Sequence, residues 1–94
     1  MYARVATVQV QPGKMEEFLR RYRAEQVPAL QAARGFREAR VLTDAHTGTV
    51  MGVTVWETEA DAKAGPNRGA QGGALMDLIT QPVVLTYYEL SVQV

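Results

Sequence analysis

The side chains that most often carry out chemistry are scarce in this sequence. Its 94 residues contain one histidine, His46, one tryptophan, Trp56, and no cysteine. A thiol nucleophile and a thiolate metal site are therefore excluded, and any metal site would consist mostly of carboxylates. His46 could act as a general base, because an unperturbed imidazole has a pKa of ~6.5. Its position two residues after Asp44, among turn-forming residues, instead favours an exposed turn.

The carboxylates and glycines also lack a recognised catalytic spacing. Three carboxylates within residues 57–61 fall at a predicted helix start, where capping and the helix dipole explain them. The glycine-rich stretch 65–73 fits neither a dinucleotide fingerprint nor a phosphate loop. Two interpretations of this stretch stay open: a flexible connection, which we favour, or a lid over a pocket. The lid could offer hydrogen bonds from Asn67, Arg68 and Gln71.

Aromatic and apolar side chains are the better candidates for a binding role. Phe18 and Tyr22 lie four residues apart on one helical stripe, where core packing is the favoured alternative. Trp56 ends a predicted strand and could fill the core, line a pocket, or do both. We assign no catalytic residue and no metal ligand. The candidate substrate-binding residues are Trp56, Phe18, Tyr22, Asn67 and Met76.

Composition indicates a single globular domain spanning residues 1–94. The chain is 47% hydrophobic and 21% charged, and ten basic residues balance ten acidic ones. This balance gives no electrostatic basis for binding nucleic acid or an anionic membrane. No apolar run approaches the length of a membrane span, and the N-terminus does not resemble a signal peptide. We therefore expect a cytoplasmic protein with no nucleic-acid or membrane partner.

The pattern of apolar residues predicts two strand–helix units joined by a hairpin. Residues 2–10 are rich in β-branched side chains and end at a Pro-Gly turn. A helical stripe then begins near residue 14; Pro28 should kink or interrupt this helix, and Gly35 should end it. A β-hairpin follows, with strands at 36–42 and 49–57 joined by a turn at 43–48.

The last third of the chain predicts a broken helix and a long strand. Thr58 and Asp61 resemble a capping box, with Asp61 reaching back in place of the usual Glu. The second helix should break at 65–73 and resume briefly at 74–79, before a strand at 83–94. The order β-α-β-β-α-β predicts an α+β, ferredoxin-like sandwich: a four-stranded antiparallel sheet with both helices on one face.

The uncovered face of this sheet predicts a partner. Both sides of the third and last strands carry large apolar residues, and four strands of about eight residues cover roughly 500 Å². An apolar patch of that size is near the upper end for a monomer, so we expect a homodimer that packs sheet face on sheet face. The alternative is a monomer whose open face is kept polar by four residues. These are Arg4, Glu38, Arg40 and Thr54.

Several of these features together resemble a known family. They are Pro12-Gly13-Lys14 followed by Glu16, Glu17 and Phe18, then Pro28 and Leu30, then Gly35-Phe36, and finally Val55-Trp56-Glu57-Thr58-Glu59-Ala60. Over its whole length the chain resembles the antibiotic biosynthesis monooxygenase superfamily of dimeric α+β barrels. The resemblance implies a homodimer with an apolar pocket between sheet and helices in each protomer. Relatives include cofactor-independent oxygenases of phenols or quinols and haem-degrading enzymes.

The catalytic residues of those relatives do not carry over to this chain. Haem-degrading members have a histidine about ten residues after the tryptophan, where Pro66 stands here, and an asparagine that the first strand lacks. Phenol-oxygenating members have Asn and Tyr where Gly52 and Ala62 stand. The resemblance thus implies a cofactor-independent monooxygenase of a small aromatic compound that lacks the usual polar partners. The alternative is a non-catalytic dimer that binds a small apolar ligand, or one whose pocket is filled by side chains.

Overall fold

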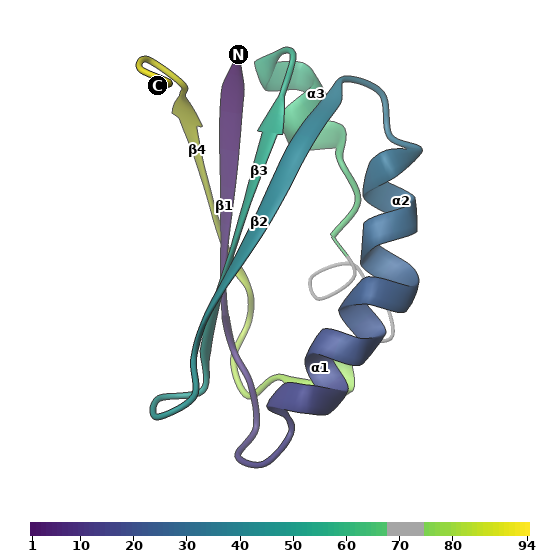
Figure 1. The fold of residues 1–94 in the computed structure, drawn as a ribbon, viewed down its shortest axis with the longest axis vertical. Helices are drawn as coiled ribbons and strands as arrows, with labels where there is room; N and C mark the ends of the chain where they lie inside the picture. The colour runs from purple at the N-terminus through teal and green to yellow at the C-terminus, as the bar shows by residue number, and fades with distance from the viewer. Residues whose placement is uncertain (68–74) are drawn as a thin grey trace.

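The computed structural model describes residues 1–67 and 75–94, and Figure 1 shows their arrangement. The elements follow the predicted order, with a π-helical segment (η1) inside the first helical region and a 3₁₀ turn (η2) before the last strand. They are β1 (Tyr2–Gln9), α1 (Met15–Arg21), η1 (Tyr22–Gln26), α2 (Val27–Gln31), β2 (Phe36–Asp44), β3 (Thr49–Trp56), α3 (Glu59–Ala64), η2 (Met76–Leu78) and β4 (Val84–Glu89).

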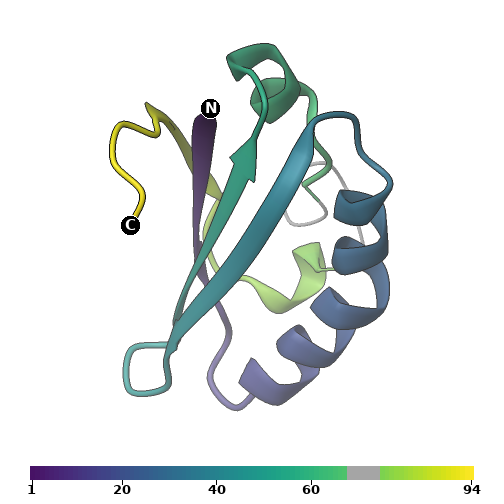
Figure 2. The same ribbon diagram turned by 45° about the horizontal axis from the view of Figure 1, so that its top comes forward.

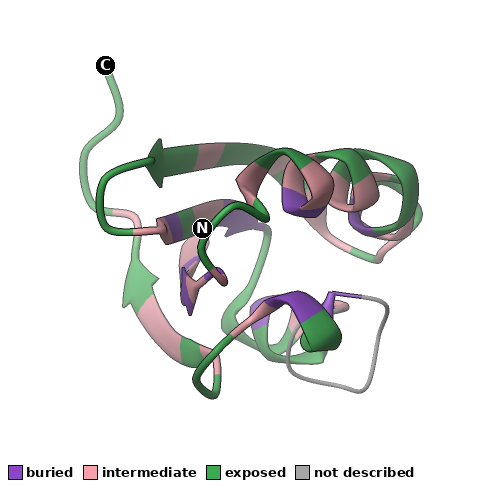
Figure 3. Cartoon of the chain, turned by 90° about the horizontal axis from the view of Figure 1, so that it is seen from below, coloured by how far each residue is buried: buried purple, intermediate pink, exposed green. Residues whose placement is uncertain are grey.

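The four strands form one antiparallel sheet in the order β2-β3-β1-β4. The helices lie on a single face of it, and the opposite face carries none (Figures 1 and 3). In the register, Arg4 of β1 stands between Thr54 of β3 and Tyr87 of β4. The predicted ferredoxin-like α+β fold is therefore confirmed.

Pro28 changes the type of the first helix without ending it. The N–H of Val27 donates to the carbonyl of Tyr22, five residues earlier, so the turn before the proline is a π turn. Pro28 itself has no N–H for an α-helical bond. The predicted irregularity is present as a widened turn, and such turns are frequent at functional sites.

The second helical region is shorter than a regular helix because it ends at Ala64. The Thr58 hydroxyl accepts a hydrogen bond from the Asp61 N–H at 3.1 Å, which is the predicted N-cap. The Asp61 carboxylate lies 3.9 Å from Arg34 Nε. After the glycine-rich stretch only the 3₁₀ turn η2 forms, in the predicted range 74–79.

The predicted last strand, 83–94, is too long. β4 ends at Glu89, where its partner Tyr2 begins β1, so no strand is left to pair with the residues beyond. The Leu90 N–H still donates to the Met1 carbonyl at 2.9 Å. Figure 2 shows the remaining residues running away from the sheet, and Val92 and Val94 are exposed.

Side chains alternate between the two faces of the sheet, so one set lies on the face covered by the helices and the other on the open face. The covered face packs against the helices through two clusters, one around Val8, Val50 and Phe18 and the other around Leu30 and Trp56. The open face exposes large apolar side chains. These are Leu42, Met51, Val84 and Tyr88.

Two of the residues expected to keep the open face polar lie on the covered face instead. Arg4 and Thr54 are directly paired in the register and both are buried. Their strands alternate only partly between apolar and polar residues, so the sequence did not determine which alternating set of side chains faces the helices.

None of the helices within the described residues has the length and apolar character that a bilayer-spanning segment needs.

Candidate functional site

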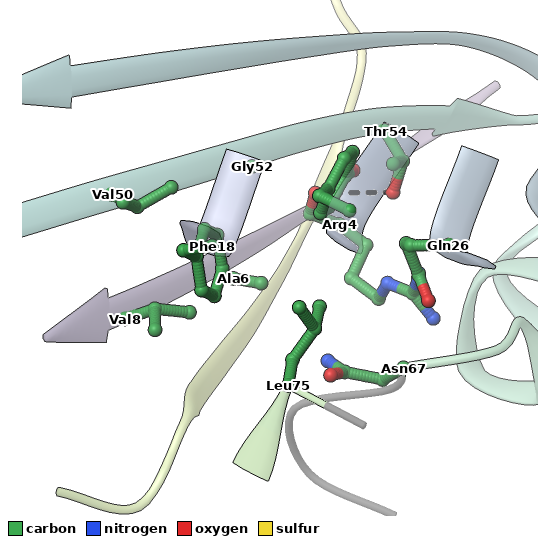
Figure 4. A pocket seen from close by; sticks show the side chains of 11 residues that line it. Arg4, Ala6, Val8, Phe18, Gln26, Val50, Gly52, Thr54, Asn67 and Leu75 are labelled. Carbon is green, nitrogen blue, oxygen red and sulfur yellow. Dashed lines mark hydrogen bonds between the residues drawn. The ribbon is translucent and has the colours of Figure 1, made fainter. Parts of the chain in front are cut away.

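A cavity of about 40 Å³ lies between the covered face of the sheet and the first helical region. Its walls come from β1, β3, α1, η1 and the residues on either side of 68–74 (Figure 4). The described residues that line it are Arg4, Ala6, Val8, Phe18, Tyr22, Gln26, Val50, Gly52, Thr54, Asn67 and Leu75.

One end of the cavity is apolar and aromatic. Val8, Val50 and Phe18 are buried there, and the rings of Phe18 and Tyr22 are stacked with centroids 6.3 Å apart. Gly52 contributes no side chain, and a Cβ atom at this position would lie 3.9 Å from the Tyr22 hydroxyl. This end of the cavity suits an aromatic ring.

Arg4 forms the polar end of the cavity. Only 3% of this residue is exposed. Its Nη1 donates to the carbonyls of Ala62 at 3.2 Å and Gly65 at 2.8 Å, and its Nη2 donates to that of Pro66 at 2.7 Å. The end of α3 and the residues after it thus hold the guanidinium in a fixed position.

The charge of Arg4 has no carboxylate partner within the described part of the chain. The sequence of residues 68–74 contains neither Asp nor Glu. The guanidinium lies over the Trp56 ring, 5.2 Å from its centroid, in a cation–π contact. Burial lowers the pKa of Arg4, and Tyr87 and Tyr22 partly oppose that shift. Arg4 is therefore a desolvated cation held by carbonyls and an aromatic face.

Two side-chain amides accompany Arg4. Gln26 and Asn67 are both buried and line the cavity together with Arg4 (Figure 4). The Nε2 of Gln26 donates to the Pro66 carbonyl at 2.9 Å, the same carbonyl that Arg4 contacts. The cavity thus has convergent polar groups at one end only, an arrangement that orients a ligand.

None of the described residues that line the cavity is a general base. Burial raises the pKa of Tyr22, and the nearby Arg4 charge only partly opposes this shift. A phenol with a raised pKa stays protonated at neutral pH and cannot accept a proton. His46 lies exposed in the hairpin turn, where its backbone N–H donates to Asp44 Oδ1 at 2.9 Å. Within the described residues, no group of three His, Asp or Glu side chains could hold a metal ion.

The structure brings together three of the five predicted binding residues. Phe18, Tyr22 and Asn67 line the cavity. Trp56 is fully buried behind Arg4, where its Nε1 donates to Thr54 Oγ1 at 2.8 Å, so it supports the wall without lining it. Met76 is 48% exposed and is not among the lining residues.

Sequence reasoning missed Arg4 and Gln26 as cavity residues. Arg4 shares the parity of Ala6 and Val8 in β1, so a basic residue on an apolar face was the available signal. Gln26 reaches the cavity from the π turn before Pro28, which shifts the helix face by one residue. The suggested lid residues Arg68 and Gln71 lie outside the described residues.

The chain belongs to the antibiotic biosynthesis monooxygenase family, because the model of that family matches residues 1–65. Among curated protein sequences, none matches this chain.

Three solved structures illustrate the proteins that share this fold. The monooxygenase ActVA-Orf6 of Streptomyces coelicolor, in complex with nanaomycin D, is 18% identical with a TM-score of 0.76, covering 99% of this chain and 89% of its own. A MhuD variant with two manganese protoporphyrin IX molecules per active site is 20% identical, with a TM-score of 0.74 and coverage of 100% and 98%. Rv0793 from Mycobacterium tuberculosis is 18% identical, with a TM-score of 0.70 and coverage of 98% and 96%. At these identities the similarity establishes the fold.

Proposed function

We propose that this protein is a cofactor-independent monooxygenase that oxidises a small aromatic compound of the phenol or quinol type. The observation that carries this proposal is the two-ended cavity, with stacked aromatic rings and valines at one end and Arg4 at the other. A phenol has the same division between an apolar ring and a polar oxygen. Membership of the monooxygenase family and the nanaomycin D complex of ActVA-Orf6 agree with an aromatic substrate.

The cavity must enlarge to admit such a compound, and Tyr22 is the side chain that can open it. Ligand cavities usually have volumes of about 300–1,000 Å³, well above the 40 Å³ found here. A second hollow of about 290 Å³ lies between α2 and β2, lined by Leu30, Phe36 and Val41 among others. Tyr22 lines both spaces. Rotation of its side chain would join them into a space of ligand size.

The proposed reaction needs no reductant. A methylene carbon activated by a phenol reacts as R₂CH₂ + O₂ → R₂C=O + H₂O: one oxygen atom becomes the carbonyl, and the other leaves as water with both hydrogens. The substrate methylene supplies all the electrons that O₂ accepts. The protein excludes water and holds the substrate in one orientation. Because none of the described lining residues is a general base, the substrate must itself be acidic enough to ionise.

Oxygen uptake with 1,8-dihydroxyanthrone and a panel of dihydroxynaphthalenes tests this proposal. We expect one O₂ consumed per substrate oxidised, at a rate above that without protein. Gly52→Leu should reduce the rate by about tenfold or more, since the new side chain fills the part of the cavity between Gly52 and the Tyr22 hydroxyl. Ala60→Leu is the control, because Ala60 is exposed on α3 and does not line the cavity. Uptake equal to that of buffer, or equal rates in both variants, would contradict the oxygenase assignment.

A non-catalytic ligand-binding role is the second candidate, and Gly52 and Ala62 favour it. These residues stand where the resemblance to phenol-oxygenating relatives calls for Asn and Tyr, and neither has a polar side chain. In this case the same compounds bind under nitrogen but are recovered unchanged after incubation in air. Binding under nitrogen followed by O₂ consumption supports the enzyme.

We also propose a homodimer in which two open sheet faces pack together. At the centre of that face Val5 pairs with Val53, and Met51, Leu42 and Tyr88 surround them. Burial of this apolar surface stabilises a twofold dimer. Light scattering should give about twice the chain mass of 10.3 kDa, and Val53→Asp should reduce it to that of one chain. A wild-type particle of single-chain mass at micromolar concentration would contradict the dimer.

A further inference from the structure

Among the residues that the structure describes, Arg4 is the only charged residue that is buried. Burying a guanidinium removes its hydration, and carbonyl groups replace that hydration without neutralising the charge. The titratable groups that act on its charge are the phenols of Tyr87 and Tyr22, and neither is a carboxylate. Lys63 Nζ lies over the Tyr87 ring, 5.8 Å from its centroid, and is paired with the Glu59 carboxylate at 3.6 Å. This end of the cavity therefore has a positive potential, and none of the described residues that line it is a carboxylate.

The guanidinium also retains hydrogen-bonding capacity. It has five N–H donors, and the carbonyls of Ala62, Gly65 and Pro66 take three of them. Arg4 lines the cavity, so an oxygen atom placed there can accept from the donors that remain. Hydrogen bonds from a charged donor to a charged acceptor are shorter and stronger than neutral ones.

We propose that the cavity binds its aromatic ligand as an oxyanion, with a phenolate oxygen at Arg4 and the ring between Phe18, Val8 and Val50. The proposal rests on the aromatic site proposed above and adds the charge state of the ligand. It also explains how a cavity without a general base can hold an ionised phenol. The buried positive charge lowers the pKa of the bound phenol, and the proton is released to solvent.

A pair of nearly isosteric ligands tests this inference on the wild-type protein. 4-Nitrophenol ionises and has a phenolate absorption band, whereas 4-nitroanisole has the same ring and cannot ionise. We expect the phenolate to bind at least about tenfold more tightly than the anisole, as for a hydrogen bond between charged groups. The absorption band should also persist to lower pH in the bound state, by about one unit or more. Tyr22 stays protonated over this range because burial raises its pKa.

Two variants assign the effect to Arg4. Arg4→Met should abolish the preference for phenolate, and Arg4→Lys should restore part of it. Arg23→Met is the control, since Arg23 is exposed on the first helical region and is not among the lining residues. Thermal unfolding of each variant checks that it is folded. If Arg4→Met fails to fold, the comparison of 4-nitrophenol with 4-nitroanisole on the wild-type protein still tests whether the ligand binds as an anion.

Three results separate this inference from the proposed function. Equal binding of 4-nitrophenol and 4-nitroanisole overturns the inference and leaves the aromatic site standing. Preference for phenolate that persists in folded Arg4→Met also overturns it. Failure of both ligands to bind contradicts the aromatic site, and the inference fails with it.

Discussion

Gly65→Ala tests the packing that holds Arg4 and Trp56 in place. Gly65 has φ −62° and ψ 150°, which any residue adopts, so the backbone does not require glycine here. A Cβ at this position would lie 2.6 Å from Trp56 Cζ2 and 2.9 Å from Arg4 Nη1. Non-bonded atoms are not found that close, so the tryptophan ring or the guanidinium must move.

Neither neighbour can move at low cost. Trp56 is fully buried and packs edge-on against Phe36, with ring centroids 5.5 Å apart. Arg4 is held by three carbonyls, one of them that of Gly65 itself. Overpacking of a well-packed core costs about 1–3 kcal/mol. For a domain of this size each kcal/mol lowers Tm by roughly 4–8 °C.

Thermal and urea unfolding at one protein concentration measure this effect. Gly52→Ala is the matched control: its Cβ would lie at ordinary contact distance, 3.9 Å from the Tyr22 hydroxyl. That control should be as stable as wild type or up to about 1 kcal/mol more stable, because alanine replaces glycine within a strand. A Tm of Gly65→Ala within a degree of wild type would refute the packing described around Arg4.

Three further predictions concern the Thr58 N-cap, the ion pairs of Glu17, and Tyr22 as the gate between the two hollows. Thr58→Ala should lower the free energy of unfolding by about 1 kcal/mol through loss of the N-cap; an unchanged urea midpoint would count against the cap. Hydrogen bonds from Arg21 and then Arg20 lower the pKa of Glu17. Their stabilisation is present above the unfolded-state pKa and disappears as pH falls through the lower folded-state pKa. Glu17→Gln should therefore be less stable than wild type at neutral pH and equal to it in acid, and a difference independent of pH would contradict this. Tyr22→Ala should bind 1-naphthol more tightly than wild type by calorimetry under nitrogen, because it joins the two hollows; weaker binding by the folded variant would argue against the gate.

The sequence was sufficient to predict the fold because its turn signals and periodicities agree. The Pro12-Gly13 turn, the hairpin turn and the Thr58 cap all lie where local chemistry places them. The length of the last strand could not be predicted in this way. Residues 90–94 keep a β-forming composition, but strand pairing depends on where β1 begins, at Tyr2.

The site was only partly predictable, for a similar reason. Phe18 and Tyr22 follow from helical periodicity, whereas the orientation of Arg4 depends on which face of β1 the helices cover. A basic side chain is ordinarily assigned to the solvent face. The carbonyls of Ala62, Gly65 and Pro66, about 60 residues away in the chain, and the Trp56 ring stabilise its burial. Met76, a predicted binding residue, lies on a short 3₁₀ turn that leaves its side chain exposed.

The central claim is that a small aromatic compound binds between Phe18 and Arg4, on the covered face of the sheet. Methyl-resolved NMR during titration with 1-naphthol under nitrogen tests it most directly. Val8 and Val50 line the cavity, whereas Val5 and Val53 lie on the opposite face of the same two strands. The account predicts saturable shifts of the Val8 and Val50 methyl signals, with those of Val5 and Val53 unchanged. Shifts confined to Val5 and Val53, or no shifts at saturating naphthol, would contradict it.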